Sequence, residues 1–258
     1  MTPSAHPSHS LTGLARIAKT RPSAGMSATE AIKQYILDEG LQPGDPLPTE
    51  AELCDSLGVS RSSVREAIRT LVSLDIVEVR HGVGTTVGGV SLAPFVNGLV
   101  FRSLMNPGGS FSSLRDVVDL REGIDMLVAD QLIAAHGRQD DPEREARLDV
   151  LVARMRDQNA RGEGFMQEDR EFHTTLLELG GSLLMQQLVA ALWEVHTIVV
   201  PQLGITPPED MDSTVDAHGA MLDAVRAADV EAYRAAVVQH YAPLHRAIAR
   251  AVDEVAVG

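Results

Sequence analysis

Four side chains in the second half of the chain have the types and spacing of a metal-binding set. Asp169 and His173 are four residues apart, so a helix places the carboxylate and the imidazole on one face, where both can bind one ion. His218 and His240 lie in two later helical segments, each flanked by apolar residues, as expected of side chains turned into a bundle. One carboxylate and three imidazoles suit Zn²⁺, Ni²⁺, Co²⁺ or Mn²⁺, and ligand type does not choose among them. Taken singly, each histidine is better explained as a core or surface residue.

A second set, in the first third of the chain, has the chemistry of nucleic-acid recognition. Arg61, Arg65 and Arg69 recur every four residues and form one cationic stripe on a predicted helix. Arginine binds guanine O6 and N7 bidentately and also grips phosphate. Ser62 and Ser63, in the first turn, are short enough to hydrogen-bond phosphate or base edges, and the free N–H groups of that turn also suit a phosphate.

The elements that must position this stripe form a compact unit. Helical spacing, caps and turn residues predict three helices and then a β-hairpin between residues 28 and 89. The first predicted helix is capped by Ser27 and has Ile32, Ile36 and Leu37 as apolar residues. A short helix follows, which begins at the capping box Thr49/Glu52, and then a helix over 61–73 that Ser60 caps, with Val64, Ile68 and Leu71 as its apolar residues. Two strands that flank residues 81–84 complete the unit.

The context of the stripe decides between two interpretations. An isolated row of arginines is best explained by pairing with Glu66 and other acids on a solvated face. On the second helix of a helix–turn–helix that a wing follows, DNA binding is the stronger hypothesis.

The elements that must position the metal-binding set are helices. After the hairpin, apolar residues recur at spacings of three and four, with breaks at 106–109, 180–181 and 201–208. The segments are about 91–105, 112–136, 142–160, 165–179, 182–203, 212–227 and 229–255. The fold class is therefore mainly α, a winged helix–turn–helix followed by an antiparallel all-helical bundle at 90–258. Residues 87–93, with two adjacent glycines, are a candidate pivot between the two.

Composition bounds the class of protein. The 258 residues, with 44% hydrophobic and 22% charged side chains, are typical of one or two soluble globular domains. The lone Cys54 excludes an internal disulfide framework and fits a reducing cytoplasm, and we see no apolar run as long as a membrane span. Residues 1–27 lack periodicity, are rich in Pro and Ser, and are predicted to be a disordered leader.

Taken alone, the net charge of −14 argues against nucleic acid as a partner. The distribution of this charge along the chain weakens that argument. Residues 1–27 carry +3, residues 28–90 carry −5 and residues 91–258 carry −12. The acidity therefore belongs mainly to the helical half, and DNA affinity must rest on a few well-placed arginines and the wing.

The segment from Ala31 to Val87 resembles the winged helix–turn–helix of GntR-type bacterial transcription regulators. The resemblance lies in "GDPLPTEAEL", "LGVSRSSVREAIRTL" and "VEVRHGVGTTV". It implies DNA contacts from the recognition helix, and it implies that His81 and Gly82 at the wing tip enter or flank the minor groove. Ala51 departs from the pattern, since the family commonly has Arg there.

Residues from about 112 to 250 resemble the FCD domain of the FadR-type branch of GntR regulators. The resemblance lies in "LREGIDMLVADQLI", "DREFHTTLLELGG" and "DAHGAMLDAVRAADVEAYRAAVVQHY". It implies a divalent metal, with Zn²⁺ as first expectation, held by Asp169, His173, His218 and His240. It also implies that Arg121 binds a small carboxylate effector, where the alternative is an ion pair with Glu122, Asp125 or another acid.

Five further residues qualify the FCD resemblance. Asp125 and Ser182 stand where the family usually has Glu and Asn. His245 is the less suitable substitute for His240, and His136 and His196, which lie in none of the motifs, are predicted to be structural.

The function predicted from these features is a ligand-responsive transcription regulator, usually a repressor in this family. It would bind a palindromic DNA operator as a cytoplasmic homodimer and respond to a small organic or sugar acid held near the metal. Two alternatives stay open: a regulator that binds a long acyl-CoA without metal, and a metalloenzyme that uses the Asp/His site.

Overall fold

The computed structural model describes residues 26–82, 84–105, 107–136, 141–180, 182–203 and 210–257, of which 107–110 and 254–257 by backbone alone. The chain divides into two compact units, residues 1–94 and 95–258. The predicted leader lies outside the described residues except for its last two, Met26 and Ser27.

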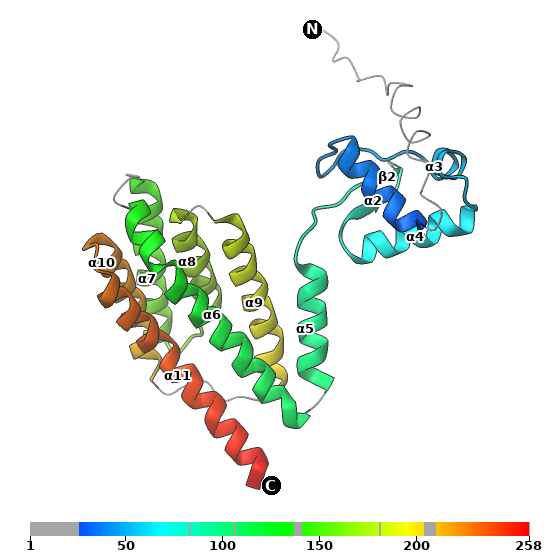
Figure 1. The fold of residues 1–258 in the computed structure, drawn as a ribbon. Helices are drawn as coiled ribbons and strands as arrows, with labels where there is room; N and C mark the ends of the chain where they lie inside the picture. Colours follow the sequence, from blue (N-terminus) through cyan, green and yellow to red (C-terminus); the bar gives the residue numbers. More distant parts are fainter. Residues whose placement is uncertain are drawn as a thin grey trace. The chain divides into compact units, whose positions relative to one another are not determined.

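The N-terminal unit consists of three helices and a two-stranded antiparallel sheet (Figure 1). Helix α4 packs against α2, α3 and β1, so it lies at the centre of the unit. The elements are α2 (Ala28–Asp38), α3 (Glu50–Leu57), α4 (Arg61–Ser73), β1 (Val77–Arg80) and β2 (Gly84–Val87). The predicted order of helix, helix–turn–helix and wing is confirmed.

Side-chain caps fix where these three helices begin. Each cap satisfies an N–H group that has no partner within the helix, and such a cap contributes about 1 kcal/mol. The Ser27 hydroxyl accepts a hydrogen bond from the main-chain N–H of Glu30, and the Ser60 hydroxyl accepts one from that of Ser63. Thr49 and Glu52 form a capping box in which each side chain accepts from the other residue's main-chain N–H.

The apolar faces of α2 and α4 meet in the core of this unit. Val64, Ile68 and Leu71 are buried there, as the spacing predicts, and so are Ile32 and Ile36. The prediction was wrong for Leu37, which is 73% exposed. Leu37 directly follows Ile36, and the 100° turn between adjacent helix residues takes it off the face that its neighbour buries.

The segment after the wing is packed onto the N-terminal unit. The main-chain N–H groups of Gly88 and Val90 donate to the carbonyl oxygens of Ile76 and Asp75 at 2.8 Å, and that of Ser91 donates to Asp75 Oδ2 at 2.8 Å. A Cβ on Gly88 would lie 2.5 Å from the Asp75 carbonyl oxygen. Glycine is required there for a close backbone approach, and these contacts hold residues 88–91 on the N-terminal unit. The pivot stays a prediction.

The C-terminal unit is a helical bundle in which α6 packs against α8, α9, α10 and α11 (Figure 1). Its described helices are α5 (Ala93–Met105), α6 (Pro107–His136), α7 (Pro142–Ala160), α8 (Met166–Leu179), α9 (Leu183–Gln202), α10 (Met211–Arg226) and α11 (Val230–Val257). Each predicted segment corresponds to one of them. The predicted break at 106–109 is partly wrong, because α6 already begins at Pro107. Proline is well accepted in the first turn of a helix, where its missing N–H group has no partner to lose.

Helix α9 is long and apolar enough to cross a membrane, which the sequence reading missed. It packs instead against α6 and α8, and it buries side chains such as Trp193, Val195 and Val199. Packing in the bundle therefore accounts for part of its apolar surface.

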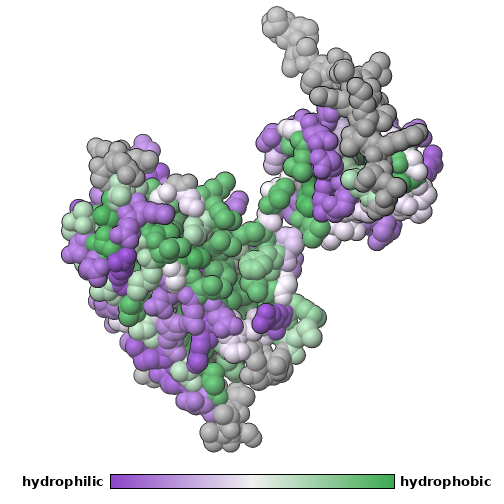
Figure 2. Space-filling model, in the orientation of Figure 1, coloured by the Kyte–Doolittle hydropathy of each residue, from purple (hydrophilic) through white to green (hydrophobic). Residues whose placement is uncertain are grey.

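Some apolar side chains of α6 and α9 face outward. Figure 2 shows a hydrophobic area on this unit over α9 and the neighbouring part of α6. Leu120 and Leu127 on α6 and Leu183 and Leu184 on α9 are exposed by more than half.

Candidate metal centre and DNA-contacting helix

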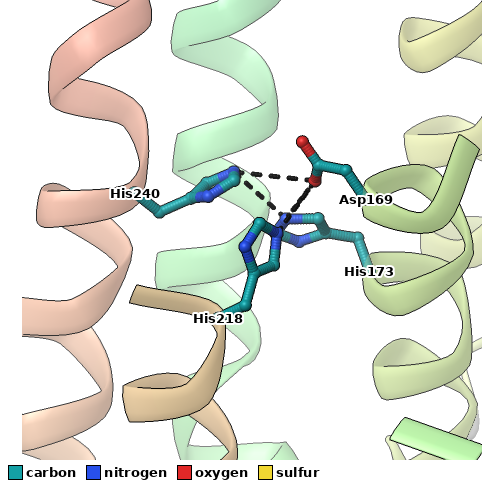
Figure 3. Close-up of side chains that lie close together, drawn as sticks. All are labelled: Asp169, His173, His218 and His240. Carbon is teal, nitrogen blue, oxygen red and sulfur yellow. Dashed lines mark hydrogen bonds and ion pairs between the residues drawn. The ribbon is translucent and has the colours of Figure 1, made fainter. Parts of the chain in front are cut away.

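The four residues of the predicted metal-binding set lie together in the C-terminal unit. Asp169 and His173 project from α8, His218 from α10 and His240 from α11, and their ring nitrogens and carboxylate point toward one another (Figure 3). All four side chains are buried, and one potential ligand atom from each lies within 4.8 Å of the other three.

The distances between these atoms are those of neighbouring ligands around one ion. Asp169 Oδ1 lies 3.0 Å from His218 Nε2, 3.2 Å from His173 Nε2 and 3.9 Å from His240 Nε2. The Nε2 atoms of His173 and His240 are 3.2 Å apart. Bonds of about 2.0–2.2 Å to one metal place adjacent ligand atoms roughly 3 Å apart. The donor set therefore fits a single small divalent ion.

The outer nitrogens of two histidines face groups that do not belong to the set. His218 Nδ1 lies 2.8 Å from the main-chain oxygen of Thr214, so Nδ1 carries the hydrogen and Nε2 is turned toward the cluster. His173 Nδ1 lies 3.1 Å from Asp125 Oδ2, and the Tyr241 hydroxyl donates to the same oxygen at 2.8 Å. Such outer partners fix ring orientation and raise ligand basicity.

The buried carboxylates of Asp125 and Asp169 favour a positive charge at the centre of the cluster. Burial lowers the pKa of His173, but the carboxylates of Asp125 and Asp169 outweigh burial and raise it to about 9. Burial alone would raise the pKa of Asp169, yet the nearby His218, His240 and His173 hold it well below its usual value. A proton or a metal ion can supply this charge, and when a metal binds it displaces the proton.

Arg121 projects from α6 into the same unit and is only 1% exposed. Its guanidinium carbon lies 3.6 Å above the Trp193 ring, and Nη1 lies 3.5 Å from His196 Nδ1. Burial and the Arg121 charge lower the pKa of His196 to about 3, so this imidazole is neutral. His196 was predicted to be structural because no motif includes it, and its place beside Arg121 arises only when α9 packs on α6.

The acids proposed as alternative partners of Arg121 are engaged elsewhere. Glu122 Oε2 lies 2.8 Å from His245 Nε2, and Asp125 contacts His173 and Tyr241. Within the described part of the chain Arg121 makes no ion pair, and its buried Nε has no hydrogen-bond partner. The guanidinium is therefore a buried cation that lacks a direct counter-ion.

A cavity of about 200 Å³ joins Arg121 to the metal-binding set. Asp169 and His240 of the set line it together with Arg121, Trp193 and His196. A ligand in this cavity can therefore reach the guanidinium and the edge of the metal centre at once.

Two other histidines lie outside the cluster. His245 contacts Glu122 and, at 3.6 Å, Asp119. His136 Nδ1 lies 3.5 Å from Glu145 Oε1.

The arginine stripe of the N-terminal unit is exposed along α4. Arg65 Nε lies 2.8 Å from Glu50 Oε2 on α3, and Arg69 pairs with Glu66 at 3.4 Å. Arg61 has no acidic partner among the described residues. Surface pairs of this kind contribute about 0–1 kcal/mol, so a phosphate can replace the carboxylates at small cost.

The start of α4 and the wing tip are also accessible. The Ser60 hydroxyl lies 2.7 Å from that of Ser62 and 2.9 Å from that of Ser63, and all three residues are exposed. His81 and Gly82 form the exposed turn between β1 and β2, and Gly82 has a φ of 77°.

With this geometry in hand, comparison with known proteins identifies the family. Residues 26–87 match the model of bacterial regulatory proteins of the gntR family, and residues 116–243 match the FCD domain. The chain belongs to the GntR family and is a DNA-binding transcription regulator with an effector-binding FCD domain. This is a family of transcriptional regulators, not of enzymes, so the metalloenzyme alternative is wrong.

Individual relatives agree with this assignment. The transcriptional regulatory protein NedR of Micromonospora viridifaciens is 44% identical over 111 residues, which cover 43% of this chain and 80% of NedR. The galactonate operon transcriptional repressor of Escherichia coli K12 is 24% identical over 190 residues, covering 74% of this chain and 81% of the repressor. The solved structure of a Streptococcus agalactiae GntR protein matches with a TM-score of 0.62 and 25% identity, over 85% of this chain and 97% of that one.

Proposed function

We propose that this protein is a repressor that binds a palindromic DNA operator as a cytoplasmic homodimer, and that a small carboxylate effector held beside a Zn²⁺ ion in the FCD domain changes its operator affinity. Control of this kind requires the effector to bind the two states of the regulator with different affinity.

The proposed DNA-binding surface combines α4 and the wing. Exposed arginines without strong acidic partners support contacts to guanine edges and phosphates. The hydroxyls at the start of α4 support a phosphate contact there. The proposed contact residues are Arg61, Ser62, Ser63, Arg65, Arg69, His81 and Gly82.

One observation carries the proposed effector site, namely the buried guanidinium of Arg121 facing the same cavity as Asp169 and His240. A buried cation without an ion pair is costly unless an anion joins it. A carboxylate could pair with the guanidinium, and it could also bind a metal ion held by Asp169, His173, His218 and His240. The bound metal would supply Lewis acidity, and the protein would supply orientation and charge.

The size of the cavity supports a small acid over a long acyl-CoA. A volume of about 200 Å³ is enough for a small organic acid. A long acyl chain joined to a nucleotide is several times larger. Such a ligand would extend well beyond the cavity, whereas a small acid fits within it.

The exposed leucines of α6 and α9 support self-association. An apolar area on the surface of a soluble protein commonly marks an interface. A twofold dimer would present two wings and two recognition helices, which is the symmetry that a palindrome requires.

A thermal-shift screen tests the proposed effector site. Tag-free protein is treated with a chelator, and organic and sugar acids are added with and without Zn²⁺. We expect Zn²⁺ to stabilise the wild type and a subset of acids to stabilise it further. At a hundredfold excess over Kd the added stability is about 2.7 kcal/mol. A wild type that gains no metal on dialysis, or that no acid stabilises, would contradict the proposal.

A further inference from the structure

The wall of the cavity between its polar groups is hydrocarbon. Phe165, Met166, Val200, Met211 and Leu244 line it, together with the Trp193 ring. Met166 is exposed, and Val200, Met211 and Leu244 are only partly buried. These side chains thus offer apolar contact area to a ligand.

Some polar groups of the lining already have partners. The Tyr241 hydroxyl donates to Asp125, and Asp169 Oδ1 contacts the histidines of the metal-binding set. His196 presents one ring nitrogen to Arg121. Beyond the metal edge and Arg121, four side-chain groups are left to bind ligand hydroxyls, namely the His196 imidazole, the Thr214 hydroxyl, the Trp193 indole N–H and His240 Nδ1. They are few beside the hydrocarbon wall of the cavity.

We infer that the effector is a small monocarboxylate with an aliphatic or aromatic body, and that the cavity discriminates against polyhydroxylated sugar acids. This inference rests on the proposed carboxylate site and narrows the ligand class. The carboxylate binds between Arg121 and the metal, while the body packs on Val200, Met211 and Leu244. Each hydroxyl of a sugar acid that lost water without gaining a partner would lower affinity by on the order of tenfold.

The protein contains its own reporter for this cavity. Trp193 is the only tryptophan in the sequence, and it lines the cavity under the Arg121 guanidinium. Its fluorescence therefore responds to ligands bound there.

The test compares hexanoate with gluconate, acids of equal chain length that differ in hydroxylation. Both are titrated into full-length, Zn²⁺-loaded protein and followed by Trp193 fluorescence and calorimetry, with hexanol as the uncharged control. We expect hexanoate to bind at least about tenfold more tightly than gluconate, because its chain leaves no hydroxyl unpaired. Hexanol should bind more weakly than hexanoate by a similar factor, because it cannot pair with Arg121.

The variant Val200→Thr places a hydroxyl in the apolar wall without changing its shape. We expect it to weaken hexanoate several-fold and to reduce the preference over gluconate. Val150→Thr, on the exposed face of α7, is the matched control and should leave both affinities unchanged.

The outcomes separate the inference from the proposed function. If gluconate binds as tightly as hexanoate or more tightly, the apolar-body inference is overturned while the carboxylate site stands. A ligand concentration of about 10 mM would saturate even a weak site with a Kd of ~1 mM. If neither acid binds at that concentration, both the inference and the proposed carboxylate site fail.

Discussion

The Nδ1 atom of His218 lies 2.8 Å from the main-chain oxygen of Thr214, one helical turn earlier on α10. Because a carbonyl oxygen only accepts hydrogen bonds, Nδ1 must carry a hydrogen, and a neutral ring then presents the lone pair of Nε2 to the cluster. That lone pair would face a carboxylate oxygen of Asp169 at 3.0 Å. Two acceptors at this distance repel each other unless a proton or a metal ion lies between them.

Metal affinity should therefore rise with pH up to about 9. The raised pKa of His173 means that the metal-free protein holds a proton where the metal binds, and the metal must displace it. We expect the Zn²⁺-induced increase in melting temperature to grow from pH 6.5 to pH 9 in a metal-buffered thermal-shift series. His245→Gln, outside the cluster, should show the same trend. A pH-independent increase would contradict a proton that competes with the metal.

The metal-free protein should show the opposite trend. Stability from a raised pKa is fully present below the unfolded value of 6.5 and is lost as pH rises through about 9. The lowered pKa of Asp169 adds no slope in this window, because that carboxylate is ionised throughout it. The lowered pKa values of His196 and His240 act in the opposite direction only near the unfolded value of 6.5, so the loss from His173 dominates toward pH 9. Chelator-treated protein should therefore melt at a lower temperature at pH 9 than at pH 6.5, as differential scanning calorimetry would record.

Asp125 should support metal binding without contacting the metal. Asp125→Asn removes the charge that faces His173 Nδ1, and we expect a loss of about 10–100-fold in Zn²⁺ affinity. Competition with a chromogenic chelator measures this loss. Asp130→Asn makes the same change on the same helix, where the carboxylate pairs with Arg234 at the surface, and it should leave the affinity unchanged. Equal affinities for the two variants would refute this role.

The arginine stripe should control operator binding. Arg65→Ala should cost about 1–3 kcal/mol of operator affinity, measured by anisotropy on a DNA site selected from a random pool. Glu50→Gln should strengthen binding, because it removes a negative charge near the phosphates and frees Arg65. Arg147→Ala, which breaks a surface pair in the C-terminal unit, is the control. Unchanged binding by Arg65→Ala would show that α4 is not the recognition helix.

The exposed leucines should form the dimer interface. Leu127 on α6 is 61% exposed, and Leu127→Asp would place a charge in an apolar contact. We expect the variant to sediment as a folded monomer in analytical ultracentrifugation. Val150→Asp, at an exposed position on α7, should remain dimeric. A monomeric wild type would contradict the proposed homodimer, and a dimeric Leu127→Asp variant would place the interface elsewhere.

Local patterns were sufficient to predict the helices, whereas the full metal-binding set was predicted from its residues together with the resemblance to the FCD domain. The caps at Thr49 and Ser60 and the four-residue spacing of Asp169 and His173 are encoded within single turns. The departure at Ser182 also has a local explanation, because its hydroxyl accepts from Met185 N and caps α9 as Asn would.

Contacts between distant segments were not predictable in the same way. His196 was read as structural, yet it lies beside Arg121, 75 residues earlier in the sequence. The role of Asp125 likewise depends on α6 packing against α8 and α11, which brings its carboxylate to His173 and Tyr241. Neither relationship has a periodicity or a spacing that a single sequence reveals.

The central claim is that a carboxylate held by Arg121 and the metal changes DNA binding. The most direct test is the anisotropy of a labelled operator with Zn²⁺-loaded protein, with and without an acid that stabilises the wild type. We predict a change in operator affinity of about 5–150-fold for the wild type, little or none for Arg121→Gln or after chelation, and a partial response for Arg121→Lys. An equal change in Arg121→Gln, or no change in the wild type, would contradict the account.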